Sequence, residues 1–188
     1  MSDDHEAIVA ALQRAIDRGD NVQLARAFAK NPTWNGFPLA LDGGLLLLRT
    51  LHDFDLDGFA VMRGRDVTEV RNGSAERFFR RVLRGERALE GIATPDVPLR
   101  SWRAAVDAVR ARYRFAIVEC ELGDGADFFL GELVADDDVD SVAMHYIHVD
   151  GTRESAVTRV ALDDVTLVRF GERYLSLFGR YAVADHHQ

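Results

Sequence analysis

The hexapeptide Asp66-Val67-Thr68-Glu69-Val70-Arg71 returns near the end of the chain as Asp164-Val165-Thr166-Leu167-Val168-Arg169. Glu76-Arg77-Phe78-Phe79 follows the first copy, and Glu172-Arg173-Tyr174-Leu175 follows the second. Each copy is typical of a strand, a tight turn and a short helical segment whose aromatic side chains pack back onto the strand. A repeated supersecondary unit decides the architecture of a chain, so it has to be recognised before single motifs are interpreted.

The rest of the sequence divides into two similar halves around these copies. Each half contains an amphipathic helix, five short apolar runs separated by turn residues, and a final short helix. The apolar runs lie at residues 22–28, 36–41, 45–51, 59–62 and 67–70, and again at 115–122, 128–135, 141–149, 155–162 and 165–170. The halves align at an offset of about 95–98 residues, which places Gly131 near Gly36 and Asp164 on Asp66.

Residues 91–100 separate the two halves. This stretch contains Gly91, Pro95 and Pro98, which disfavour both helix and strand, so it is expected to be a linker. We therefore predict a first module at residues 1–90 and a second at residues 101–188. Ser74 and Ser101 are expected to cap the helices that begin at them. The predicted fold class is mainly β with α: two tandem five-stranded barrels, each preceded by a helix and followed by a short helix.

Composition excludes several classes of protein. The 188 residues are 47% apolar and 29% charged, which is typical of a globular chain, and the formal charge of −8 argues against extensive phosphate binding. Cys120 is the only cysteine, so no intramolecular disulfide can form, which suits a reducing cytoplasm. The N-terminus does not have the pattern of a signal peptide, and the apolar run at residues 45–48 is too short to span a bilayer. We expect a cytoplasmic protein without membrane contact.

Three segments resemble the Sm-like (Hfq-like) family, whose early strands carry a glycine, an alternating run and an aspartate before the third strand. Gly36-Phe37-Pro38-Leu39-Ala40-Leu41-Asp42 has this form, and so does Gly131-Glu132-Leu133-Val134-Ala135-Asp136-Asp137. Ala60-Val61-Met62-Arg63-Gly64-Arg65-Asp66-Val67 resembles the later Arg-Gly motif of the family. The resemblance implies that each half is an Sm-like or SH3-like barrel, in a chain similar to bacterial tandem proteins of this type. It carries over no activity.

The chain departs from the family pattern where Sm-like proteins bind RNA. The asparagine expected after the first-motif aspartate is replaced by Gly43-Gly44 in the first half and by residues 138–140 in the second. The second half has Leu162-Asp163 where Arg-Gly is expected. A uridine pocket of the family type would be incomplete in one copy and missing in the other, so the resemblance supports the fold and not the ligand.

An acidic segment is a candidate cation site. Asp53, Asp55 and Asp57, followed by Gly58, match the opening of a calcium-binding loop, in which alternate carboxylates provide oxygen ligands. The twelfth position, where a bidentate glutamate is expected, is Gly64, and the flanking residues are typical of strands. An acidic hairpin that bends at Gly58 is the favoured interpretation.

Arginines on the helix predicted at residues 74–86 form a second candidate site. These arginines are Arg77, Arg80, Arg81 and Arg84. Their helical spacing predicts a basic face, which with Arg63 could bind nucleic acid. A solvated helix face paired with acidic residues elsewhere is the favoured alternative.

No catalytic motif is present: the chain lacks Gly-x-Ser-x-Gly, a Walker loop and Gly-x-Gly-x-x-Gly. Cys120 lies in an apolar run, where a thiol is usually buried and inert. No cofactor is implied.

The sequence therefore favours a non-catalytic binding or scaffold protein whose partner is another protein, including a second copy in a homodimer. One alternative is an RNA-binding regulator that uses Arg63 and the basic helix. Another is a small enzyme with its site between the two barrels.

Overall fold

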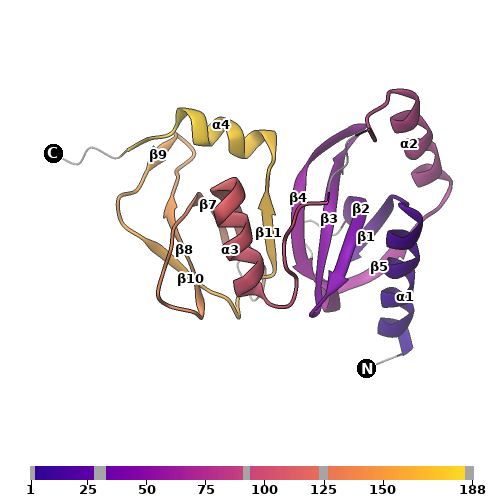
Figure 1. The fold of residues 1–188 in the computed structure, drawn as a ribbon, viewed down its shortest axis with the longest axis horizontal. Coiled ribbons are helices and arrows are strands. Elements are labelled where there is room, and N and C mark those ends of the chain that lie inside the picture. The colour runs from indigo at the N-terminus through magenta and orange to yellow at the C-terminus, as the bar shows by residue number, and fades with distance from the viewer. Residues whose placement is uncertain (1–2, 28–32, 91–93, 123–126, 185–188) are drawn as a thin grey trace.

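A computed structural model describes residues 3–27, 33–90, 94–122 and 127–184, and shows a mainly β fold with four helices in this part of the chain (Figure 1). The helices are α1 (Asp3–Arg18), α2 (Ser74–Gly85), α3 (Trp102–Tyr113) and α4 (Arg173–Tyr181), and a 3-10 turn, η1, covers Gly64–Asp66. The strands are β1 (Val22–Arg26), β2 (Thr33–Asp42), β3 (Leu45–His52), β4 (Asp55–Arg63), β5 (Val67–Arg71), β6 (Phe115–Cys120), β7 (Asp127–Leu133), β8 (Ser141–Tyr146), β9 (Thr152–Arg153), β10 (Thr158–Ala161), β11 (Leu167–Phe170) and β12 (Val183–Ala184). No helix among these is both long and apolar enough to cross a membrane.

Ten strands form one antiparallel sheet in the order β10-β8-β7-β6-β11-β4-β3-β2-β1-β5. The order within the first half, β4-β3-β2-β1-β5, is the same as the order β10-β8-β7-β6-β11 within the second. The halves join in the middle of Figure 1, where β11 pairs with β4 and Val168 lies opposite Val61. The sheet is open and not closed into a barrel, so the prediction of two tandem five-stranded barrels is not confirmed. The reason is that β11, the last strand of the second half, also satisfies the free edge of the first.

A glycine at the same place in each half allows the sheet to bend. Gly36 on β2 lies opposite Thr50 on β3, and Gly131 on β7 lies opposite Tyr146 on β8. A Cβ atom on either glycine would overlap a backbone carbonyl of the neighbouring strand. The close approach of the two backbones therefore requires glycine. The two glycines therefore have similar surroundings in the two halves of the sheet.

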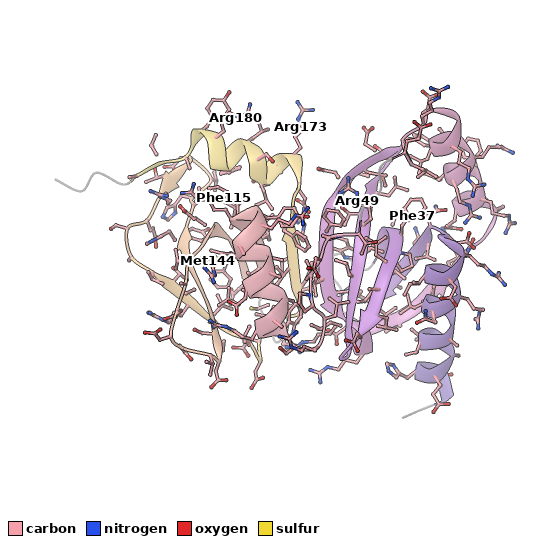
Figure 2. All side chains as sticks on the ribbon, viewed as in Figure 1. Phe37, Arg49, Phe115, Met144, Arg173 and Arg180 are labelled. Carbon is pink, nitrogen blue, oxygen red and sulfur yellow. The ribbon has the colours of Figure 1, made fainter. Side chains whose placement is uncertain are left out.

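The largest buried apolar cluster contains residues of both halves. Leu47 and Val61 from the first half lie in one cluster with Val109 of α3 and Val118 and Val168 of the second half. Figure 2 shows side chains filling the space between α3 and the sheet, where Met144 is also buried. Because apolar burial is the main stabilising term in folding, this shared core holds the halves together. A second cluster, beneath α1, includes Leu12, Leu24 and Met62.

The ends of the helices follow the expected residues with one correction. Ser101 caps α3, since its Oγ accepts the backbone N–H of Ala104 at 3.2 Å. Ser74 is instead the first residue of α2, which Gly73 precedes as N-cap. The Glu76 carboxylate supplies the cap there by accepting the Gly73 N–H at 2.6 Å. A carboxylate in the first turn satisfies that donor more strongly than a hydroxyl because the bond is charge-assisted.

The segment before α3 is packed against the protein. Residues 91–93 of the expected linker lie outside the described residues, and residues 94–101 form neither helix nor strand. Val97 and Leu99 are nevertheless buried in the shared core. Leu99 and Arg100 also lie against Gly43, where a Cβ atom would overlap the Leu99 carbonyl.

Candidate functional site

A pocket of about 710 Å³ lies where the two halves meet, and we call it the junction pocket. It is bounded by α1, the β2–β3 turn, the end of β4 with η1, the start of α3, and residues 162–163. Six of its lining side chains are apolar: Val9, Leu12, Leu41, Leu45, Trp102 and Leu162. Its polar side chains are His5, Arg63, Arg65, Ser101 and Asp163. The pocket needs both halves, because each contributes to its wall.

Two glycine-containing turns shape this pocket. Gly43 and Gly44 of the β2–β3 turn have φ angles of 54° and 81°, a backbone conformation that favours glycine. The Gly64 N–H donates to the Gly44 carbonyl at 2.8 Å, which ties the turn to η1. The Gly43-Gly44 turn directly follows one of the segments that resemble Sm-like motifs in the first half, and η1 lies within the other. The structure therefore brings both segments to one side of the junction pocket.

The predicted site residue Arg63 lies in this pocket, but its side chain is mostly buried and already hydrogen-bonded within the protein. It is only 6% exposed, and its guanidinium donates to the carbonyl of Asp163 in the second half. The neighbouring Arg65 side chain is 72% exposed and lies 3.9 Å from Asp66. Burial raises the pKa of Asp66, and the positive charge of Arg63 opposes this rise. Arg63 therefore joins the halves, and Arg65 is the more accessible cation.

The strand register corrects the expected position of the Arg-Gly motif in the second half. Met62 and Val160 occupy equivalent places on β4 and β10, opposite Leu46 and Val142. Ala161 and Leu162, rather than Leu162 and Asp163, therefore stand where Arg63 and Gly64 stand in the first half. The second half still lacks the Arg-Gly pair.

Two polar side chains of the junction pocket, Ser101 and Arg63, are engaged in structural contacts. Ser101 Oγ accepts the helix-capping bond from Ala104, and the Arg63 guanidinium holds the Asp163 carbonyl. Burial raises the pKa of Cys120 to about 11, so this thiol is protonated at neutral pH. A thiol in that state is a poor nucleophile. The described part of the chain contains no cluster of three or more His, Cys, Asp or Glu side chains able to hold a metal ion.

The predicted acidic segment forms the hairpin between β3 and β4. Asp53 lies in the turn with a φ of 51°, Asp55 begins β4, and Asp57 follows on that strand. The Asp57 carboxylate accepts the Arg173 N–H at 2.7 Å, at the first residue of α4. Carboxylates stabilise helix N-termini. Asp57 therefore caps a helix of the other half, and that role was not foreseen.

The predicted basic side chains lie on α2 at the outer side of the first half (Figure 1). Arg77, Arg81 and Arg84 are exposed, whereas Arg80 forms an ion pair with Asp20. Arg77 and Arg80 line a groove next to α1. Arg63 lines the junction pocket and not this groove, so the structure does not unite the predicted nucleic-acid residues in one site.

An aromatic cluster next to α2 was missed by the sequence interpretation. Phe54 of the acidic hairpin stacks on Phe79, with ring centroids 4.7 Å apart and planes 18° apart. Phe78 packs edge-on against both rings, and Arg81 lies 5.4 Å from its centroid. Phe54 and Phe78 remain 42% and 46% exposed. Their proximity joins the hairpin to the helix, a contact across the fold that local sequence patterns do not reveal.

A buried ion pair between the halves was also missed. Arg26 at the end of β1 donates two hydrogen bonds to Glu121, at 3.2 and 2.6 Å, and the Thr166 hydroxyl donates to the same carboxylate at 2.6 Å. Both ion-pair partners are almost completely buried. The partners lie 95 residues apart in sequence, so no spacing rule could have paired them.

No family model matches this sequence, and comparisons with curated proteins and solved structures find no significant similarity. Function therefore has to be inferred from the geometry of the chain itself.

Proposed function

We propose that the protein is a non-catalytic binding protein that holds a segment of a protein partner in the junction pocket. The observation that carries this proposal is the composition of the pocket: six apolar side chains surround about 710 Å³. Concave sites of this size, mostly apolar with a few polar groups, are typical binding sites. The exposed Arg65 favours a partner segment that places a carboxylate beside its apolar side chains.

The small-enzyme alternative is less well supported. Acid–base catalysis requires a titratable group within hydrogen-bonding reach of a reacting atom. In the junction pocket the Ser101 hydroxyl and the Arg63 guanidinium are both held by backbone groups. The buried thiol of Cys120 keeps its proton at neutral pH. None of these three groups is available to start a reaction, which leaves His5 and Asp163 as the acid–base side chains of the pocket lining.

The RNA-binding alternative rests on Arg63 and the α2 arginines acting together. These residues line different surfaces, and the Arg63 guanidinium already donates a hydrogen bond to the Asp163 carbonyl. The formal charge of −8 also opposes binding to a long polyanion. We therefore favour a protein partner over RNA.

A scaffold role through a homodimer is the second part of the proposal. The cluster formed by Phe54, Phe78 and Phe79 presents exposed aromatic rings beside Arg81. Aromatic residues and arginine are enriched in protein interfaces. If a second copy covers this cluster, light scattering should give a dimer for the wild type and a monomer for a Phe54→Ser, Phe78→Ser variant. A dimer in both would exclude this interface.

We further propose that each half is an Sm-like module. The supporting observation is the repeated order of a helix followed by five sheet strands that occupy the same relative positions. Superposition of experimentally determined halves on each other and on Sm-like proteins would test this directly.

A matched pair of valine substitutions tests the binding site. Val9 lines the junction pocket at the surface of α1, and Val149, outside the pocket, is 92% exposed. Val9→Trp should fill the pocket and abolish co-purification of the partner, which mass spectrometry would identify with the wild type. Val149→Trp should retain the same partner. Retention of that partner by Val9→Trp would exclude the junction pocket.

Binding can also be followed through Trp102. This residue lines the junction pocket, whereas the other tryptophan, Trp34, does not. In a Trp34→Phe background, addition of the purified partner should shift the emission of Trp102. Arg65→Glu should weaken the titrated affinity about tenfold, since it removes a charge-assisted bond. An unchanged emission spectrum at saturation would contradict the proposal.

A further inference from the structure

Four arginines from two helices line a groove of about 380 Å³ on the outer side of the first half. Arg14 and Arg18 come from α1, and Arg77 and Arg80 come from α2, which lies beside α1 at this side of the molecule (Figure 1). We call this surface the arginine groove. It shares no lining residue with the junction pocket.

The sequence places these arginines on facing sides of the groove. Arg14 and Arg18 are four residues apart and Arg77 and Arg80 three apart, so each pair lies on one helix face. Small or apolar residues, Ala11, Ala15, Val22 and Val70, form the rest of the wall with Asp20 and Asn72. The small side chains leave room between the two rows of guanidinium groups.

The positive charge of the arginine groove is only partly neutralised. Four arginines face one aspartate, which gives the lining a net charge of +3. Asp20 pairs with Arg80 and accepts a hydrogen bond from Asn72 at 3.0 Å. Arg14, Arg18 and Arg77 are exposed, and no hydrogen bond or ion pair engages their side chains within the described residues. Like charges gathered in this way favour an anion.

We propose that the arginine groove binds a small molecule that carries two or more linked phosphate groups. A guanidinium matches phosphate oxygens with two parallel hydrogen bonds, so three free arginines can engage at least two phosphates. The volume of the groove falls within the range of small-molecule sites. This site goes beyond the binding function proposed for the junction pocket and uses different residues.

A short ligand fits the groove better than RNA does. The exposed α2 residues Arg81 and Arg84 lie outside its lining, so the positive surface does not continue as a long track. The equivalent groove of the second half, between α3 and α4, holds Arg112 and Arg180 but also Phe115. Arg180 projects from α4 away from the sheet (Figure 2). We therefore expect the first half alone to bind the ligand.

Calorimetry with inorganic pyrophosphate and tripolyphosphate at 150 mM salt tests the proposal. We expect saturable binding to the wild type, with about tenfold weaker affinity for each of Arg14→Ala, Arg18→Ala and Arg77→Ala. Arg84→Ala and Arg180→Ala are matched controls and should change affinity less than twofold. Circular dichroism would verify that each variant is folded, and the three single substitutions are independent of one another.

Three outcomes would overturn the proposal. The first is the absence of binding to either phosphate compound at millimolar concentration. The second is equal affinity for citrate, which would show a nonspecific anion effect. The third is tight binding of a short single-stranded RNA that pyrophosphate does not displace, which would assign the arginines to nucleic acid. Failure of the partner experiment at the junction pocket would leave all three measurements unaffected.

Discussion

The strands β4 and β10 occupy the same place in their halves but differ in their position in the ten-stranded sheet. β4 pairs with β11 and lies inside the sheet, whereas β10 forms its edge. Val61 on β4 and Arg159 on β10 are equivalent, since they lie opposite Leu47 and Ala143. Val61 is completely buried in the shared core, and Arg159 is exposed and pairs with Asp136 at 2.7 Å.

The difference shows how one fold position can either join or close a sheet. An apolar face beside an open strand edge invites another strand to pair, and a charged residue there discourages it. The first half has the apolar face and receives β11. The second half has the Arg159–Asp136 pair, and its edge ends the sheet. The hydrogen bond from Arg159 also lowers the pKa of the Asp136 carboxyl, so the pair is charged at neutral pH.

Placing each of these two residue types at the other position, in separate variants, should give the largest and most unequal changes in the free energy of unfolding. Val61→Arg buries a charge without a partner and should lower the free energy of unfolding by about 3–5 kcal/mol. Arg159→Val removes only a surface ion pair and should change it by less than about 1 kcal/mol. Urea denaturation of both variants measures the contrast. Equal losses would contradict the assignment of one buried and one exposed edge.

Light scattering of the Arg159→Val variant tests whether the charge of Arg159 keeps the edge of β10 from pairing with another molecule. Removal of the charge from β10 should increase self-association with protein concentration, relative to the wild type. Arg153→Val is a suitable control, because Arg153 lies on β9, outside the ten-stranded sheet. Unchanged mass for Arg159→Val would show that other features protect this edge.

The contact between halves also depends on Arg26, a charged residue whose matching position in the second half is uncharged. Val22 of β1 lies opposite Gly36, and Ala116 of β6 lies opposite Gly131. Arg26 is four residues after Val22 and Cys120 is four residues after Ala116, so these two residues occupy matching positions. Arg26→Ala would leave Glu121 buried without its partner and should cost about 3 kcal/mol of unfolding free energy. Combined replacement by Arg26→Met and Glu121→Leu should recover most of this loss. If thermal or urea denaturation shows no recovery, the stability lost in Arg26→Ala comes from the missing hydrogen bonds of Arg26 and not from the unpaired charge of Glu121.

The two bend glycines should respond alike if the halves are true repeats. Gly36→Ala and Gly131→Ala each force a Cβ atom against the adjacent strand, so each should lower stability by about 1–3 kcal/mol. Gly85→Ala is the control, because a Cβ atom there meets nothing within 4 Å. A large loss at only one bend glycine would break the proposed equivalence.

The smallest expected effect concerns pH. Burial raises the pKa of Glu119, although Arg169 opposes this rise. A raised folded-state pKa contributes stability below the unfolded value, and this contribution is lost as the pH rises through the folded value. Glu119→Gln should therefore reduce the loss of stability between pH 4 and pH 7, measured by urea denaturation. The equivalent residue in the first half, Ala25, has no charge and provides no such pH dependence.

The two bends, most strands and the start of α3 could be predicted from sequence because their signals are local. Gly36 and Gly131 mark the bends, the apolar runs mark most strands, and Ser101 marks the start of α3. The sharing of β11 between halves could not be predicted, because β11 and β4 lie about 100 residues apart and no local pattern links Val168 to Val61. The two-residue strands β9 and β12 are too short to leave a pattern.

The candidate sites were predicted less well than the fold. Arg63 was identified, but its carbonyl partner and the apolar wall of the junction pocket come from distant segments. Arg77 and Arg80 were identified as part of a basic face, while Arg14 and Arg18 were overlooked on another helix. A site made from two helices becomes visible only when their packing is known.

The place of β11 in the sheet has a consequence for biosynthesis. The strand that covers the edge of β4 lies at Leu167–Phe170, near the C-terminal end of the described chain. While the ribosome is still producing residues 64–166, the edge of β4 has no native partner. Nascent chains are most vulnerable to misassembly when apolar strand edges stay open. Premature stop codons before residue 167 should therefore yield aggregating fragments, and assembly of the nascent protein should finish only after β11 leaves the ribosome.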